Sequence, residues 1–510
     1  MSRLHQFVQG VSSSWLATFA TVLYSLLSVP IALRYLSVDE FGLFVLLLQV
    51  AGYFTLAEVG MSAATARILI DHKDSVNNGC YGSIIITGSC VFFVQALIVF
   101  TIGLALAPWI VGLVGVTDAF SETATFLLKW LAATSALSLA FRMYGAVLYA
   151  NKRLDLIHAF MGTNVLFGLV LLTIILATGG GLLGLVWLFA IQAAIGVILP
   201  GLACHRLGLL PSKGCWGAAS MQRFRELFGF GKDIFLVNVG NHVLEASQLI
   251  IVSRTMGLSS AAIWSVSTKL FTLIFQLVAK IQGTAIVFFA EMMVRREGLK
   301  LAVRFRNIYQ LTASISVVAL VVVVTINQRF VSVWAGPSLA WSIDLSALLA
   351  TLVFLNALTR CGADFIVYTK NIALFRYVYF AEAAAFAIMA IWLSETFGFY
   401  GILGASLSCL LLFRAVYITK RMADYFSLPA KTFWWTWLKR PIISVLTLIP
   451  FVLTANWIAS STLSQWGQLW LASIWIGLPA IIVFYVVALP REIQGEIKLR
   501  LPKLALCSKP

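Results

Sequence analysis

The chain has 510 residues, of which 61% are apolar and only 11% are charged, and its mean hydropathy is +0.95. So little polar surface excludes a soluble globular protein. The formal net charge of +16 comes from basic residues scattered over many short segments. Nucleic-acid binding would require them on one continuous face, so we exclude that class of partner.

Apolar runs of about 20 residues, the length needed to cross the hydrocarbon of a bilayer, follow one another along the whole chain. The sequence predicts fourteen of them, and the class is therefore an all-α polytopic membrane protein. The first run is longer than a signal-peptide core and is followed by no small-residue cleavage site, so we expect it to stay attached. The predicted runs are 12–36, 42–69, 80–107, 122–149, 158–178, 182–204, 230–254, 260–291, 306–326, 340–369, 372–394, 399–419, 440–460 and 467–489.

The first run carries a stripe of hydroxyl side chains spaced four and three residues apart, which places them on one helical face. Two interpretations stay open: the hydroxyls line a polar cavity, or they hold neighbouring helices together. Ser25 is the member that we assign to the cavity in the first case. The stripe consists of Ser14, Thr18, Thr21, Ser25 and Ser28.

Charged residues interrupt the second and fourth runs. A charge at the centre of a membrane helix costs roughly 2.5–3.5 kcal/mol, so such residues usually face a water-filled cavity or a partner charge. Arg142 has no carboxylate nearby in the sequence, and we predict that it faces a cavity. Glu58 is a candidate for binding a coupling Na⁺ or H⁺, and no other cofactor or metal is expected.

Two segments recur at almost the same offset. Gly181-Leu-Leu-Gly184 opens one run and Gly398-Phe-Tyr-Gly401 opens another, and Gly145-Ala…Lys152 is matched by Gly362-Ala…Lys370. We infer that a membrane half has been duplicated, giving six-helix halves at 1–210 and 211–430 around a central cavity. Residues 431–510 add two helices and a cytoplasmic tail. Such an internal repeat is typical of a transporter.

The seventh and eighth runs each present a polar face. In the seventh, Glu245 is a second candidate for ion coupling, and its neighbours on the stripe are amides. In the eighth, the ammonium groups of Lys269 and Lys280 start roughly 16 Å apart along the helix axis, close to the reach of an extended anionic head group. We favour a cationic cavity; the alternative is that each lysine snorkels or pairs with a buried carboxylate. The two stripes are Asn238, Asn241, Glu245 and Gln248, and Lys269, Thr272, Gln276 and Lys280.

Later runs hold further charges. Arg360 and Asp364 are four residues apart and are expected to neutralise one another within a helix. Glu382 and Arg414 are also intramembrane, and the sequence does not choose which acid binds an ion.

The distribution of basic residues predicts the orientation. With the N-terminus inside, 27 of the 36 basic residues fall on the cytoplasmic side and four, Arg34, Lys129, Arg254 and Arg329, on the other. The positive-inside rule therefore places both termini in the cytoplasm.

Motifs of catalysis are missing from the sequence. It contains no phosphate-binding loop, no Asp-x-Asp pair, no His-Glu-x-x-His and no Cys-x-x-Cys, and the seven cysteines have no motif spacing. We expect a protein that is not an enzyme.

The segment Val29-Pro-Ile-Ala-Leu-Arg-Tyr-Leu-Ser37, followed by Glu40-Phe-Gly-Leu-Phe44 and by Tyr53-Phe-Thr-Leu-Ala-Glu-Val-Gly-Met-Ser62, resembles the opening of bacterial polysaccharide flippases. These belong to the multidrug, oligosaccharidyl-lipid and polysaccharide exporter superfamily. By that resemblance Glu58 and Arg67 match commonly charged positions of the second helix. Lys269, Lys280, Arg142 and Arg67 would then form a cationic, substrate-binding cavity, with Asn238, Asn241, Gln276 and Ser25 as its polar lining.

The resemblance implies that the chain moves an undecaprenyl-pyrophosphate-linked oligosaccharide from the inner to the outer leaflet of the bacterial cytoplasmic membrane by alternating access. The product would feed O-antigen or exopolysaccharide synthesis, with membrane lipids and the polysaccharide polymerase and chain-length machinery as partners. The alternatives are an ion-coupled drug antiporter of the same superfamily, which would favour acidic cavity residues, and a membrane polysaccharide polymerase. The segment Lys431-Thr-Phe-Trp-Trp-Thr-Trp-Leu-Lys-Arg440 introduces two extra helices that line a lipid-facing groove or merely pack.

Overall fold

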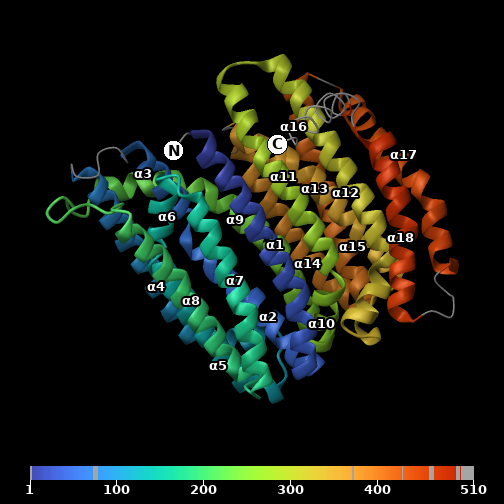
Figure 1. Ribbon diagram of the computed structural model, residues 1–510, viewed down its shortest axis with the longest axis horizontal. Helices are drawn as coiled ribbons and strands as arrows, with labels where there is room; N and C mark the ends of the chain where they lie inside the picture. Colours follow the sequence, from blue (N-terminus) through green and yellow to red (C-terminus); the bar gives the residue numbers. More distant parts are fainter. Residues whose placement is uncertain are drawn as a thin grey trace, which may run out of the picture. The chain divides into compact units, whose positions relative to one another are not determined.

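The computed structural model describes residues 3–72, 79–369, 373–427, 429–458, 464–489 and 494 (Figure 1). Over these ranges the chain forms helices joined by short turns, with no strand. Thirteen of the described helical stretches are long and apolar enough to cross a membrane. The predicted all-α polytopic class is therefore confirmed.

One predicted run, 230–254, is not among these thirteen stretches of the described chain. It lies within α9 (Met221–Met256), a helix of 36 residues. The amide, histidine and carboxylate side chains between 238 and 248 lower the hydropathy of this helix.

The chain divides into two compact units, Met1–Ala262 and Ile263–Pro510. The division into six-helix halves at 1–210 and 211–430 with an appended pair at 431–510 rests on the sequence repeat and stays a prediction.

The first unit contains nine helices and one 3₁₀ turn among the residues described. Ser37 caps the N-terminus of the helix Val38–Phe54. Its hydroxyl accepts from the Glu40 amide, and the Glu40 carboxylate accepts from the Ser37 amide. This capping box satisfies two amides that the first helical turn leaves without partners. The elements are α1 (Arg3–Tyr35), α2 (Val38–Phe54), η1 (Thr55–Glu58), α3 (Met61–His72), α4 (Cys80–Leu113), α5 (Asp118–Ala140), α6 (Met143–Ala150), α7 (Leu154–Ala177), α8 (Gly181–Arg206) and α9.

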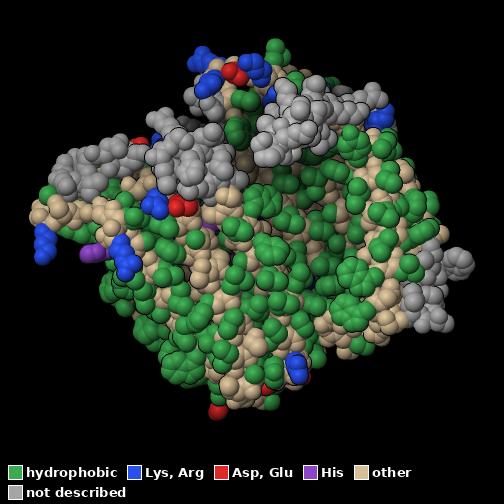
Figure 2. Space-filling model, in the orientation of Figure 1, with side chains coloured by type: hydrophobic (Ala, Val, Ile, Leu, Met, Phe, Trp, Pro, Cys, Tyr) green, Lys and Arg blue, Asp and Glu red, His purple; other side chains and the backbone are tan. Residues whose placement is uncertain are grey.

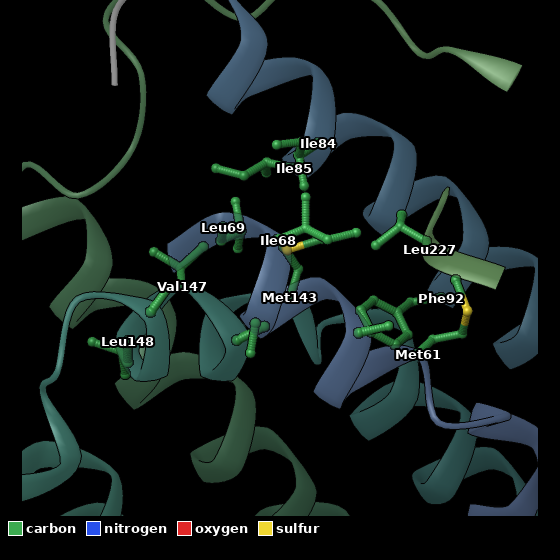
Figure 3. Close-up of a cluster of buried hydrophobic side chains, with 14 of the residues drawn as sticks. Met61, Ile68, Leu69, Ile84, Ile85, Phe92, Met143, Val147, Leu148 and Leu227 are labelled. Atoms are coloured by element: carbon green, nitrogen blue, oxygen red, sulfur yellow. The ribbon is translucent and has the colours of Figure 1, made fainter. Parts of the chain in front are cut away.

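A cluster of buried apolar side chains holds α3, α4 and α6 together (Figure 3). Met61 of α3 lies beside Phe92 of α4, and Leu69 of α3, Met143 of α6 and Leu227 of α9 belong to the same cluster. Lipid tails are as apolar as these side chains, so close packing rather than exclusion from water stabilises such contacts.

The second unit contains the remaining helices, and the boundary between the units falls within α10. In this unit α12 packs against α13, α17 and α18, which lie side by side in Figure 1. Its elements are α10 (Leu258–Ser267), α11 (Lys269–Val294), α12 (Gly298–Trp334), η3 (Pro337–Leu339), α13 (Ile343–Tyr368), α14 (Ala373–Phe397), α15 (Phe399–Cys409), the π-helix η4 (Leu410–Ala415), α16 (Val416–Phe426), α17 (Ala430–Ile458), α18 (Gln465–Val483) and the π-helix η5 (Phe484–Ala488).

Three predicted runs are interrupted in the structure. The run 42–69 breaks where Val59 and Gly60 take positive φ values of 52° and 69°, a backbone conformation that no right-handed helix contains. The run 122–149 breaks at Phe141 and Arg142, and the run 260–291 breaks at Thr268. Apolar composition predicts a span but carries no information on the local backbone, so these breaks were not predicted.

The glycine repeat has the same structural role in both units. Gly181 at the start of α8 and Gly398 before α15 both take positive φ, 51° and 56°. A side chain at the second glycine of each motif would collide with the preceding helix: Gly184 faces the Ile175 side chain, and Gly401 faces the Leu393 carbonyl. The repeat thus builds a tight turn between consecutive helices in each unit.

Hydrophobic side chains cover most of the described surface on the face shown in Figure 2. Large exposed residues such as Phe93, Trp109, Ile388 and Trp392 are 63–73% accessible. An apolar exterior of this kind is what a surface in contact with lipid tails requires.

We predict that Gly401→Ala lowers the thermal stability of the purified protein, because the added methyl group meets the backbone of α14 and overpacking costs about 1–3 kcal/mol. Gly404→Ala is the matched control, since its methyl group would enter open space in the same helix. Thermal unfolding in detergent measures both. Equal unfolding temperatures for the two variants would contradict the tight-turn role.

Candidate functional site

An ion pair joins two of the helix breaks in the first unit. The Nη2 of Arg142 lies 2.7 Å from the Oε2 of Glu58. The Nε of Arg142 also donates to the Ser62 hydroxyl, at 3.0 Å. Arg142 therefore has its partner in another segment of the chain.

The breaks themselves position this pair. Glu58 is the last residue of η1, directly before the positive-φ residues, and Arg142 is the N-cap of α6. The second Glu58 oxygen accepts from the Ser62 amide at 3.1 Å, and the Glu58 carbonyl accepts from the Gln95 side chain at 3.2 Å. In a continuous helix the Ser62 amide and the Glu58 carbonyl would bond to other backbone groups. Here side chains bond to them instead, because a backbone group left without a partner in a membrane is costly.

The pair is only partly shielded. The Glu58 side chain is 15% exposed and that of Arg142 is 44% exposed. A carboxylate held by a guanidinium and an amide is poorly suited to bind a cation as well, because its oxygens already accept charge-assisted hydrogen bonds.

A cavity of about 660 Å³ lies beside this pair, within the first unit. Ala57 and Val59, which flank Glu58, contribute to its wall together with Gln95. Most of the remaining wall is apolar and comes from α4 and the first turns of α9, including Val91, Ile98, Phe224 and Phe228.

The second unit contains a more deeply buried ion pair. Glu382 of α14 is 1% exposed, and both of its oxygens accept from Arg414, at 2.6–3.2 Å. Arg414 also donates to the Asn356 side chain of α13 at 3.0 Å and stacks over the Tyr379 ring at 5.1 Å. The guanidinium connects α13, α14 and η4.

Arg414 lies in the π-helical turn η4, and such turns are frequent at functional sites. Here both carboxylate oxygens of Glu382 are occupied by one guanidinium. This network therefore serves packing, and Glu382 is a poor candidate for binding an ion. The predicted pair of Arg360 with Asp364 is also present, with 3.8 Å between Nε and Oδ2.

The polar face of the eighth run lies on α11, also in the second unit. Lys269 is the first residue of α11, directly after the break at Thr268, and Lys280 follows three turns later. Both lysines are partly buried, whereas Thr272 and Gln276 between them are exposed. Lys269 makes no ion pair with any described residue. The face thus holds a cation that no described carboxylate neutralises.

The other predicted site residues are more dispersed. Arg67 lies 3.4 Å from Asp71 one turn along α3, and both side chains are more than half exposed. Glu245 is exposed on α9, and Ser25 is partly buried on α1. The side chains of Asn238 and Asn241, like those of the tryptophans at 434–437, lie outside the described residues.

In the hydroxyl stripe of α1, Thr18 and Thr21 donate to carbonyls of their own helix, those of Ser14 and Ala17. Such bonds satisfy the hydroxyls locally, so they leave both interpretations of the stripe open.

Apart from the Arg360–Asp364 pair, sequence reasoning did not find the partners of the intramembrane charges. The Ser62 hydroxyl accepts from Arg142, and the Asn356 side chain accepts from Arg414. The Gln95 side chain donates to the Glu58 carbonyl beside the first break. The pairing of Glu58 with Arg142 joins segments distant in the chain and had no local signal.

Comparisons with known proteins agree with this architecture. The model of a family described as "Polysaccharide biosynthesis protein" matches residues 7–293, more than half of the chain. A comparison with curated protein sequences gives no match.

Solved structures show the same fold at low identity. A structure of "Lipid II flippase MurJ, inward closed conformation" is 10% identical, with a TM-score of 0.70 over 94% of this chain and 99% of that one. An inward-facing multidrug resistance MATE family transporter of the MOP superfamily is 11% identical, with a TM-score of 0.67 over 79% of this chain and 95% of that one. A MOP superfamily transporter from Pyrococcus furiosus, 12% identical, has a TM-score of 0.61, over 82% of this chain and 96% of that one. The chain therefore has the fold of these transporters.

We predict that Arg414→Met destabilises the protein by about 3–5 kcal/mol, because it leaves the buried Glu382 carboxylate without its partner. Arg67→Met removes the exposed partner of Asp71 and should cost less than about 1 kcal/mol. Unfolding of each variant in detergent measures the difference. The double variant Arg414→Met with Glu382→Leu should recover part of the loss; similar stabilities for the two single variants would refute a packing role for the buried pair.

Proposed function

The chain belongs to the polysaccharide biosynthesis protein family, and on that premise we propose that it translocates a polyprenyl-pyrophosphate-linked oligosaccharide across the cytoplasmic membrane. Transport runs from the inner to the outer leaflet, and both termini face the cytoplasm. The observation that carries the proposal is the cationic polar face of α11, formed by Lys269, Thr272, Gln276 and Lys280.

The chemistry of this face fits the proposed cargo. Pyrophosphate is a dense anion that hydrocarbon does not admit without compensation. Lysines attract it as point charges without the bidentate clamp of arginine, which favours release on the far side. Exposed Thr272 and Gln276 between the two lysines offer hydrogen-bonding groups to sugar hydroxyls.

The rest of the cargo needs no charged site. The polyprenyl tail stays in lipid, while the head group and sugar pass through the protein by alternating access. The chain performs no covalent chemistry in this cycle, and its product supplies O-antigen or exopolysaccharide assembly by a polymerase and its chain-length partners.

An ion gradient is the proposed energy source, and we assign the coupling carboxylate to Glu245. Glu58 is the other candidate from the sequence, but its oxygens are engaged by Arg142 and the Ser62 amide. Glu245 is exposed on α9 and has the freedom to bind Na⁺ or H⁺.

The double variant Lys269→Ala with Lys280→Ala should abolish polysaccharide export and leave the amount of protein in the membrane unchanged, because the anion loses both compensating charges. The matched control is Lys152→Ala with Lys420→Ala, which removes the same net charge from two exposed positions. Export is measured as surface polysaccharide and abundance by immunoblot of membranes. Normal export by the α11 double variant would overturn the proposed site.

Glu245→Gln should make transport insensitive to collapse of the Na⁺ or H⁺ gradient and slow it at least tenfold, while Glu58→Gln should lower stability and leave the gradient dependence intact. Transport by proteoliposomes with imposed gradients checks this. Gradient dependence that survives in Glu245→Gln and disappears in Glu58→Gln would reverse the assignment.

A further inference from the structure

An apolar groove of about 400 Å³ runs between α12, α13 and α17 of the second unit. Its wall includes Val317 and Val324 of α12, Phe354 of α13, and Ile449 and Leu453 of α17. Ile449 and Leu453 are 40% and 71% exposed, so the groove is bordered by side chains that remain accessible from outside the protein. Such a wall accommodates hydrocarbon chains.

A second cavity of different character shares one wall residue with the groove. This polar pocket has a volume of about 290 Å³ and lies where α12 ends and where α13 and α18 begin. Val324 belongs to both walls, which makes the two cavities neighbours along α12. The polar residues of the pocket are Thr325, Gln328, Arg329, Ser332, Gln465 and Gln468.

Arg329 is the cation of this pocket. Within the described residues it forms no ion pair and no hydrogen bond, unlike Arg142 and Arg414. Its guanidinium offers five N–H donors in a planar fork that matches the oxygens of a phosphate. The glutamine amides add neutral hydrogen-bonding groups around it. The Ser332 hydroxyl donates to the Gln328 carbonyl at 2.7 Å and contributes only its polar surface.

The polar pocket and the apolar groove together fit an amphiphilic ligand that carries one negative charge. The polar pocket has the volume of about ten water molecules, which suits a phosphate with a small polar substituent and not a pyrophosphate carrying an oligosaccharide. One arginine balances the single charge of a phosphodiester. The adjoining groove provides the apolar surface for its chains.

We propose that this composite cavity is a binding site for an anionic phospholipid, with the phosphodiester on Arg329 and an acyl chain between α12, α13 and α17. With the termini in the cytoplasm, the site opens to the outer leaflet. It lies on a different set of helices from the α11 lysine face and does not depend on the identity of the transported cargo.

Native mass spectrometry of the full-length protein with phosphatidylglycerol or phosphatidylcholine tests the site. The wild type should retain phosphatidylglycerol preferentially, and Arg329→Gln should weaken that binding about tenfold, the loss expected for a hydrogen bond to a charged group. Arg329→Lys should restore part of it. Arg34→Gln, which removes an exposed arginine outside the cavity, should bind as the wild type does. Val445→Trp, which fills the groove, should weaken both lipids.

Three results would overturn the proposal. The first is equal retention of phosphatidylglycerol by the wild type and Arg329→Gln. The second is Arg329-dependent binding of inorganic phosphate at the same strength as the lipid, which would exclude a role for the groove. The third is binding confined to undecaprenyl pyrophosphate, which would make the cavity part of the cargo path. None of these measurements uses polysaccharide export. The phospholipid site can therefore fail its test while the transport proposal stands, and the transport proposal can fail while the phospholipid site stands.

Discussion

Every charge placed within hydrocarbon must find a partner or water, and this constraint governs the architecture described here. Arg414 and Glu382 satisfy it by burial against one another, with Asn356 and Tyr379 completing the environment of the guanidinium. Arg142 and Glu58 satisfy it at the junction of two interrupted helices. Each pair fixes the position of the helices that it joins. Apolar packing alone would hold these helices loosely, because apolar side chains contact lipid tails nearly as favourably as they contact one another.

Two cations of the described chain, Lys269 and Arg329, are not neutralised in this way. Lys269 lies on a polar helix face, and Arg329 lies in a polar pocket beside an apolar groove; neither pairs with a described carboxylate. Arg142, Arg360 and Arg414 each pair with a carboxylate. We infer that Lys269 and Arg329 bind anions that are not part of the described chain. Both are suited to anions attached to lipids, one as cargo and the other as a resident of the membrane.

The fold was largely predictable because its main determinant is composition. Runs of apolar residues predict spans directly. The repeated glycine motifs indicated a duplication, and in the structure Gly181 and Gly398 both take positive φ where their helices begin. The interruptions at Val59 and Thr268 were not predictable from apolar content. Side chains distant in sequence bond to the backbone beside them: Gln95 donates to the Glu58 carbonyl and Asn327 to the Ser267 carbonyl. The same holds for the site: the lysine spacing on α11 was visible, whereas the capture of Arg142 by Glu58 and the cavity around Arg329 exist only once the helices have packed.

The central claim, that the chain carries a lipid-linked oligosaccharide to the outer leaflet, is tested most directly by the pool of lipid-linked sugar in cells lacking the gene. Mass spectrometry identifies the lipid, and lectin accessibility in intact and permeabilised cells reports the leaflet. The account predicts accumulation of an undecaprenyl-pyrophosphate oligosaccharide reachable only after permeabilisation. An unchanged pool, together with altered sensitivity to cationic dyes, would contradict it and indicate a drug antiporter instead.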